Sequence, residues 1–264
     1  MSVKKIIFLN QKGGVGKTTT AVNLGSALAK MGNKVLLLDL DSQGNLTSGI
    51  GADGRGPGMY EVIAGTCSAD DACQKTVVDN LFVIPSNIHM AGLNIELVAQ
   101  YEREQFLKRA LSTLDDSWDY ILGDCPPSLG LVTVNAMTWA QQVIIPMQCE
   151  YYAMEGLSVI THLIEQMRAS GVNPGLSIEG ILMTMFDART RLAADVVAEV
   201  REHFGDLVYD TIIPRNVRIS EAPSFGQPVV FFDPQSRGAI AYRVLAEEFV
   251  ERHSKLQSLA GLQC

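Results

Sequence analysis

Short apolar runs alternate with longer amphipathic segments along this chain. Continuous apolar runs at residues 4–10 and 34–39 predict strands buried on both faces, and further strands are expected at residues 81–85, 120–123, 143–146, 178–185 and 208–213. Apolar residues at helical spacing predict helices at residues 17–31, 102–114, 155–170, 192–204 and 238–255. Gly32 is placed to end the first helix, and the glycine-rich residues 49–58 indicate a loop. This alternation predicts an α/β fold, a doubly wound and mostly parallel β-sheet flanked by helices.

Composition narrows the class of protein. The chain has 264 residues, of which 47% are hydrophobic and 19% charged, which excludes a disordered tail protein. Neither a repeat nor a linker divides it, so we expect a single domain over residues 1–264. No stretch approaches 18 apolar residues, and no CxxC spacing occurs among the five cysteines, so we expect no membrane span and free thiols. Because the first strand begins close to Met1, we also expect neither a signal peptide nor an N-terminal helix-turn-helix segment.

The strongest chemical signal is a glycine-rich segment between the first predicted strand and helix. Glycines there let backbone N–H groups face phosphates, Lys17 can reach the β- and γ-phosphates, and the Thr18 hydroxyl can ligate Mg²⁺. Gln11 stands where the standard phosphate loop has glycine, and Lys12 adds a second positive charge. The residues expected to bind the nucleotide here are Lys12, Gly13, Gly14, Val15, Gly16, Lys17, Thr18 and Thr19.

Three carboxylates follow predicted strands. Asp39 and Asp41 alternate at the end of the second strand, so they point the same way at the edge where ligands bind. One could hold the loop or a magnesium-bound water, and the other could orient the attacking water. Asp124 ends the buried run at residues 120–123, the position of a carboxylate on Mg²⁺. We therefore expect Thr18, Asp39 and Asp124 to surround Mg²⁺.

These motifs resemble the ParA/MinD family of P-loop ATPases, with deviant Walker A, A′ and B motifs at residues 12–19, 39–45 and 124–129. Residues 148–157, 182–189 and 213–224 resemble its ParA/Soj-type partitioning branch, so the resemblance covers nearly the whole chain. It implies slow, Mg²⁺-dependent, partner-stimulated hydrolysis of ATP by a sandwich homodimer. Lys12 would reach the partner's phosphates, Lys17 would act within its own subunit, and Asp41 would position the hydrolytic water. Pro214 and Asn216 would line the adenine pocket.

The resemblance also implies partners. The ATP-bound dimer would bind double-stranded DNA without sequence preference, and a ParB-type centromere-binding protein would stimulate hydrolysis and release, in chromosome or plasmid partition. A cytoplasmic, nucleoid-associated protein is expected. Although the net charge is −8, residues 211–243 hold four arginines and only two acids. The expected DNA-binding residues are Arg189, Arg218, Arg215 and Arg237. The alternative is that these arginines pair with local acids or pack against nucleotide loops.

Other functions share part of this pattern. A ParA-like positioner of another cargo, such as a chemosensory cluster or a microcompartment, would carry every catalytic residue. A MinD-like membrane ATPase would want a basic amphipathic tail, whereas residues 251–264 hold two basic residues and neither Phe nor Trp, so no membrane partner is expected. A nucleotide sensor without turnover is also compatible with the sequence. The chain departs from the family pattern at Ser42, Gly123, Phe225 and Gln235.

Overall fold

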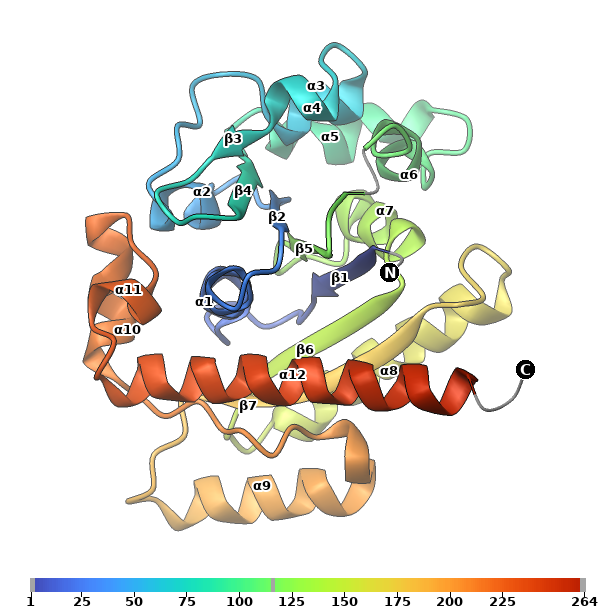
Figure 1. Cartoon of the computed structure of the whole chain (residues 1–264). Helices are drawn as coiled ribbons and strands as arrows, with labels where there is room; N and C mark the ends of the chain where they lie inside the picture. The colour runs from blue at the N-terminus through green and yellow to red at the C-terminus, as the bar shows by residue number, and fades with distance from the viewer. Residues whose placement is uncertain (1–2, 115–116, 262–264) are drawn as a thin grey trace.

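A seven-stranded sheet lies at the centre of the computed structural model, which describes residues 3–114 and 117–261, with the backbone alone for residues 255–261. The strand order is β3-β4-β2-β5-β1-β6-β7, and every neighbouring pair is parallel except β3 with β4 (Figure 1). The predicted doubly wound, mostly parallel sheet is thereby confirmed. The strands are β1 Lys4–Phe8, β2 Val35–Asp39, β3 Gln74–Lys75, β4 Leu81–Ile84, β5 Tyr120–Asp124, β6 Gln142–Gln148 and β7 Ser177–Thr184.

Helices connect the strands and cover the sheet. The α-helices are α1 Lys17–Lys30, α2 Asn45–Gly49, α3 Met59–Ala64, α4 Ala69–Ala72, α5 Met90–Glu96, α6 Phe106–Ala110, α7 Leu131–Trp139, α8 Ala153–Ala169, α9 Arg191–Phe204, α10 Val217–Glu221, α11 Val229–Phe232 and α12 Arg237–Gly261. Three short 3₁₀ segments, at Leu97–Ala99, Gly205–Leu207 and Ala222–Phe225, complete the described elements. As predicted, α1 ends just before Gly32, whose φ of 94° is readily adopted only by glycine.

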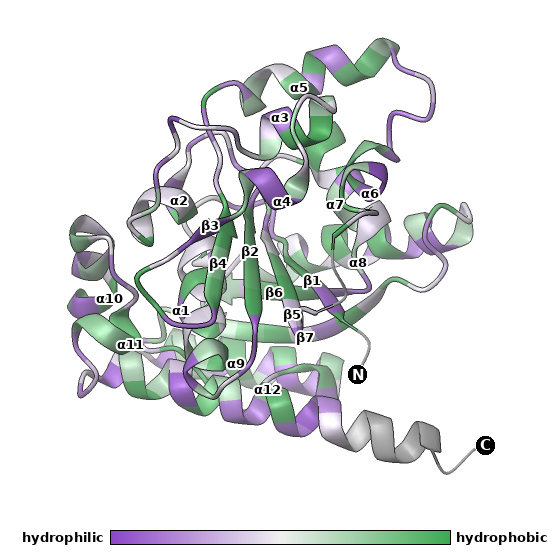
Figure 2. Ribbon diagram, turned by 45° about the horizontal axis from the view of Figure 1, so that its top comes forward, coloured by the Kyte–Doolittle hydropathy of each residue, from purple (hydrophilic) through white to green (hydrophobic). Residues whose placement is uncertain are grey.

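The strands are apolar on both faces because each face carries its own core. In β1, Ile6 and Phe8 pack with α1 and α12, whereas Ile7 and the following Leu9 pack with helices α3 to α8. The same alternation in β2 divides its leucines between the two cores. Figure 2 shows hydrophobic colour along most of β2 and β4. Continuous apolar runs therefore mark the central strands of this sheet.

Both tryptophans lie at the amino edge of the sheet. Trp118 comes two residues before β5, and Trp139 ends α7 three residues before β6. Each is buried, and neither indole N–H has a hydrogen-bond partner. Trp118 meets Phe82 edge-on, with ring centroids 5.0 Å apart, and the Lys34 ammonium lies 4.3 Å from its ring centroid. The carboxyl ends of the parallel strands, where ligands bind in such folds, lie at the opposite edge.

The strand predicted at residues 208–213 is wrong. This segment runs beside β7 but makes only isolated bridges, Ile181 with Val208 and Phe186 with Pro214. Glu248 of α12 accepts hydrogen bonds from the backbone N–H groups of Asp210 and Thr211, at 2.8 and 2.9 Å. The Tyr209 N–H still bonds to Ile181 of β7 at 3.0 Å, but the Thr211 N–H, the next donor that a ladder would need, is turned toward α12, and the segment stays irregular.

Two other predicted elements have different bounds in the structure. The helix expected at residues 102–114 is reduced to α6, and Glu102, with a φ of 51° in the left-handed region, cannot belong to it. Met185 likewise has a φ of 52° and ends β7 one residue earlier than predicted. Several helices were not predicted, among them α7 and the short α2 to α5, because their patterns are too brief or too uniformly apolar to show a helical period.

Cys67, Cys73, Cys125 and Cys149 are free thiols, as predicted, while Cys264 and residues 262–263 of the tail lie outside the described residues. Among the described residues, no helix combines the length and the apolar character needed to cross a membrane.

A buried polar cluster lies at the amino edge of β6 and β7. Glu179 Oε2 accepts a hydrogen bond from Gln142 Nε2 at 2.6 Å and lies 3.5 Å from His253 Nε2. The Tyr209 hydroxyl donates to the other Glu179 oxygen at 3.4 Å. Burial raises the pKa of Glu179 from 4.5 to about 7, although Arg252 acts in the opposite direction. The folded chain therefore holds a proton on Glu179 that the unfolded chain releases.

This cluster predicts a pH-dependent stability. Glu179 stabilises the fold fully below pH 4.5, and its contribution is lost as the pH rises through about 7. As the pH rises from 4.5 to about 7, we expect the free energy of unfolding of Glu179→Gln to increase by about 3 kcal/mol relative to that of the parent chain. Urea unfolding of both proteins across this range measures the difference. A difference that does not change with pH would contradict the prediction.

Candidate functional site

The glycine-rich loop joins β1 to α1 at the carboxyl edge of the sheet. Gly14 and Gly16 have φ values of 74° and 90°, in the left-handed region that side chains rarely tolerate. Gly16 is the residue from which α1 begins. Since β1 lies between β5 and β6, the loop opens where the direction of strand succession reverses, the position of ligand sites in such sheets.

Residues from the ends of β6 and β7 hold this loop from the side. The Thr184 hydroxyl donates to the Val15 carbonyl oxygen at 2.8 Å, and Gln148 Nε2 donates to that of Gly14 at 3.0 Å. The sequence analysis included the segments that contain Gln148 and Thr184 but assigned these two residues no role. Their position at the ends of predicted strands could have indicated that they lie beside the loop. Both side chains restrain the loop from strands distant in sequence.

Lys17 and Asp124 form the buried centre of the site. The Lys17 side chain is buried, with Nζ 3.5 Å from the Lys12 carbonyl oxygen. Burial lowers the pKa of Lys17, while Asp124 and Asp41 act in the opposite direction. Asp124 is also buried, and neither carboxylate oxygen has a hydrogen-bond partner within 3.5 Å, although the Thr18 hydroxyl lies close enough to lower its pKa. Burial and then Asp39 raise the pKa of Asp124 well above its ordinary value, while Thr18 and Lys17 oppose this.

Such a carboxylate is suited to a cation. Leaving a buried carboxylate without donors is costly, and a bound divalent ion would remove that cost. Thr18, the first threonine of α1, supplies a hydroxyl beside it, and carboxylate with hydroxyl oxygens suits Mg²⁺. The side chains present therefore fit the magnesium ion that the loop motif implies.

Asp39 and Asp41 carry different hydrogen bonds although they are two residues apart. Asp39 is fully buried at the end of β2, opposite Asp124 in the β2–β5 register. Its oxygens accept from the Asp41 N–H at 3.2 Å and from the N–H and hydroxyl of Thr47 at 2.9 and 2.6 Å. Burial raises the pKa of Asp39 to about 6, while the Thr47 hydrogen bonds lower it. Asp41 is half-buried and accepts from the Gln43 N–H at 3.0 Å.

Lys12 points away from the buried centre. It forms an ion pair with Glu150, which lies just after β6, and 54% of the Lys12 side chain is exposed. Its backbone N–H donates to Asn10 Oδ1 at 3.0 Å, and Asn10 Nδ2 donates to the Pro146 carbonyl oxygen at 2.8 Å. The two lysines of the loop are therefore divided, with Lys17 inside and Lys12 at the surface.

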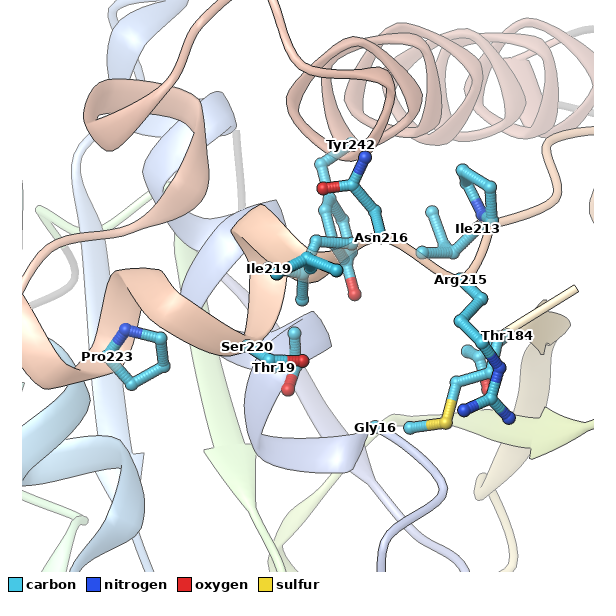
Figure 3. A pocket seen from close by; sticks show the side chains of 13 residues that line it. Gly16, Thr19, Thr184, Ile213, Arg215, Asn216, Ile219, Ser220, Pro223 and Tyr242 are labelled. Carbon is cyan, nitrogen blue, oxygen red and sulfur yellow. The ribbon is translucent and has the colours of Figure 1, made fainter.

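A cavity of about 340 Å³ opens beside Gly16. Figure 3 shows it between the start of α1, the segment around Arg215 and Asn216, and Tyr242 of α12. Its lining includes Gly16, Thr19, Thr184, Met185, Ile213, Pro214, Arg215, Asn216, Val217, Ile219, Ser220, Pro223 and Tyr242. An apolar lining with a few amide and hydroxyl groups suits a planar heteroaromatic ring. Pro214 and Asn216 lie in this lining, beside the phosphate loop, where an adenine pocket was expected.

Comparison with known proteins agrees with this geometry. The AAA_31 family, described as an AAA domain, matches residues 3–178. The chain is 49% identical to the chromosome-partitioning ATPase Soj of Treponema pallidum, covering 94% of this chain and 98% of that protein. It is 47% identical to the chromosome-partitioning protein ParA of Caulobacter vibrioides, covering 98% of each. The chain belongs to the ParA/Soj family of partitioning ATPases.

Solved structures extend the likeness to the fold of this ParA/Soj-family chain. The structure of cobyrinic acid a,c-diamide synthase from Mycobacterium smegmatis, with bound ADP and magnesium, is 37% identical, with a TM-score of 0.82 and 96% of each chain covered. The septum site-determining protein MinD of Pyrococcus horikoshii, complexed with Mg-ADP, is 27% identical, with a TM-score of 0.75 and 99% of each chain covered. Both neighbours hold a magnesium nucleotide.

The arginines expected on the DNA face of this ParA/Soj-family chain are largely engaged by acids. Arg189 donates to both oxygens of Asp187, at 2.9 and 2.7 Å, on the loop after β7. Arg218 of α10 pairs with Glu221 at 2.8 Å and with Asp233 at 3.0 Å. In this structure Arg189 and Arg218 therefore pair with local acids, as the alternative interpretation of the sequence expected.

The other two expected arginines lie on either side of Arg218. Arg215 lines the cavity, and Arg237 is an exposed residue at the start of α12. Nearby Phe225 is 64% exposed and stacks on Phe232, with ring centroids 4.8 Å apart. Arg215 thus lines the cavity, Arg218 lies in sequence between two of its lining residues, and Arg237 begins the helix that supplies Tyr242 to it.

The cavity also contains a residue that sequence reasoning missed. Tyr242 is buried, and its hydroxyl lies 3.3 Å from the Thr20 hydroxyl of α1. It comes from α12, which packs along α1 on the same face of the sheet. An apolar helix position predicts burial but not a place in a cavity, so the sequence held no signal for this role.

Proposed function

We propose that two copies of this chain, each holding ATP and Mg²⁺, form a sandwich dimer that binds non-specific double-stranded DNA and is stimulated by a ParB-type partner. Membership of the partitioning family already makes the protein a magnesium-dependent ATPase. The observation that supports nucleotide and magnesium binding in this proposal is the buried Lys17 near the buried carboxylate of Asp124, at the carboxyl edge that also carries a cavity lined by Pro214 and Asn216.

Each residue of the phosphate loop would then have one task. Backbone N–H groups of residues 13–19 bind the phosphates, and Lys17 neutralises charge on the transferred γ-phosphoryl group. Thr18 and Asp124 would hold Mg²⁺, which would offset negative charge on the phosphates. Asp39 already accepts three hydrogen bonds, so its place near magnesium stays a prediction.

The remaining two residues would act on water and on the partner. Asp41 orients the hydrolytic water, because its carboxylate is half-buried on the loop after β2, at the edge where the phosphates lie. Lys12 exchanges the carboxylate of Glu150 for the phosphates bound by the second subunit. That exchange ties dimer formation to the presence of ATP.

DNA binding would use the arginines next to the cavity. Phosphate contacts supply non-specific affinity, and a dimer doubles their number. Arg218 and Arg189 must exchange carboxylate partners for DNA phosphates, so the affinity of a single subunit is low. Occupancy of DNA then follows the ATP state, and the protein resides on the nucleoid until a ParB-type protein triggers hydrolysis.

Binding to non-specific duplex DNA tests this proposal. We expect salt-sensitive binding with a slowly hydrolysed ATP analogue and little with ADP or without nucleotide. Arg218→Glu is expected to weaken binding at least tenfold and to lower the salt slope of the dimer by about two. Arg168→Glu is the matched control, because this exposed arginine ends α8, which leads toward the amino edge of the sheet. Equal affinity in all nucleotide states would contradict the proposal.

A further inference from the structure

The carboxylate of Asp39 joins two segments of the chain. One oxygen accepts from the backbone N–H of Asp41 at 3.2 Å, and the other accepts from both the N–H and the hydroxyl of Thr47. Asp39 is fully buried and Thr47 is 4% exposed. Because both side chains are buried, bulk water does not compete with these hydrogen-bond partners.

The Thr47 hydroxyl is itself fixed from a third segment. It donates its only hydrogen to Asp39 at 2.6 Å, so it can accept at its lone pairs. The backbone N–H of Ser86, just after β4, donates to it at 2.9 Å. Pro85, the preceding residue, accepts from the N–H of Met59 at 2.8 Å at the start of α3. A continuous chain of hydrogen bonds thus runs from α3 and β4 through Thr47 and Asp39 to Asp41.

That chain supplies one of the bonds that hold the loop around Asp41. After the N–H of Asp41 bonds to Asp39, the Asp41 carbonyl oxygen accepts from Gly44 at 3.0 Å and its side chain accepts from Gln43. Gly44, with a φ of 63°, then leads directly into α2, which carries Thr47. The preceding residue, Leu40, is buried, and its N–H donates to the Asp124 carbonyl oxygen at 3.0 Å, so the bond to Asp39 is one of two that fix the backbone where Asp41 leaves β2.

We propose that Thr47 is a positioning residue for ATP hydrolysis, whose hydroxyl holds Asp39 so that Asp39 fixes the backbone at Asp41. This inference rests on the proposed role of Asp41. Thr47 would act through Asp39, to which its hydroxyl donates. Its loss leaves the buried Ser86 N–H without this acceptor and leaves the Asp39 oxygen with the Thr47 N–H alone, so the position of Asp39 under the Asp41 loop is less tightly fixed.

The test compares side chains of nearly equal size. Thr47→Val removes the hydroxyl and keeps the shape, whereas Thr47→Ser keeps the hydroxyl. Phosphate release at saturating MgATP gives kcat, its ATP dependence gives KM, and a fluorescent ATP analogue gives Kd. We expect Thr47→Val to lower kcat about 10- to 100-fold, with KM and Kd changed less than about threefold. Thr47→Ser is expected to recover most of the lost turnover.

Two controls separate the possible outcomes. Thr138→Val removes another buried hydroxyl, which donates to the Val134 carbonyl oxygen at 2.9 Å in α7, and is expected to leave kcat unchanged. Asp41→Ala tests the proposed function itself, because turnover equal to that of the parent chain would refute the role of Asp41. A Thr47→Val kcat within twofold of the parent overturns the inference, as does a rise in KM at constant kcat. If Thr47→Val fails to fold, equal turnover of Thr47→Ala and Thr47→Ser overturns it.

Discussion

Asp41→Ala is expected to lower ATP turnover by at least about 100-fold while the ATP-bound dimer still forms. The carboxylate would orient the attacking water, and alanine cannot do so. Dimer formation is retained because Asp41 is not part of the phosphate loop, and removing a negative charge near the phosphates does not weaken nucleotide binding. Phosphate release measures turnover, and sedimentation with and without ATP measures the dimer.

An exposed acid provides the comparison for this variant. Asp195 lies on α9 and is 66% exposed at its side chain, so Asp195→Ala removes one charge far from the phosphate loop and should leave turnover unchanged. Turnover of Asp41→Ala within a few-fold of the parent chain would show that another group orients the water. Loss of both dimer and turnover would instead assign Asp41 to nucleotide binding.

Lys12→Ala is expected to weaken the ATP-bound dimer at least about 30-fold while a single subunit still binds nucleotide. A charge-assisted contact buried in an interface contributes about 2–5 kcal/mol, and 1.4 kcal/mol corresponds to a factor of ten. The ion pair with Glu150 that must first break is half exposed, so its loss costs at most about 1 kcal/mol. Sedimentation across a range of protein concentrations gives the dimer affinity, and a fluorescent nucleotide gives binding to the subunit.

The edge strand offers a matched control for Lys12. Lys75 is exposed on β3, and Lys75→Ala removes the same charge without touching the loop. A dimer of unchanged affinity in Lys12→Ala would mean that Lys12 keeps Glu150 as its partner. Loss of nucleotide binding by the single subunit would mean that Lys12 acts within its own site, as Lys17 does.

The parts of this molecule that depend on local pattern could be predicted from its sequence. Apolar runs marked the central strands because both faces of the sheet are buried, and glycines with Lys17 and Thr18 marked the phosphate loop. The position of Asp124 at the end of an apolar run was enough to predict its place beside that loop, since parallel strands bring their carboxyl ends to one edge.

What could not be predicted depends on groups that are distant in sequence. Glu248 accepts hydrogen bonds from two backbone N–H groups in the segment where a strand was expected, residues 208–213. No residue near that segment in the sequence indicates this contact. The carboxylates beside Arg218 include Asp233, which only the fold brings within 3.0 Å. Thr47 stands eight residues after Asp39 in a helix of five residues, too short for its side chain's direction to be read from a pattern.

The location of the two tryptophans determines which changes in this protein intrinsic fluorescence can report. Trp118 and Trp139 sit at the amino edge of a sheet whose strand β5 has five residues, so about 15 Å separates them from the edge that binds nucleotide. Their emission will shift when the core opens, since both are buried. Nucleotide arriving at the opposite edge leaves their surroundings unaltered. Intrinsic fluorescence is therefore a clean reporter of unfolding, whereas nucleotide occupancy requires a labelled ligand.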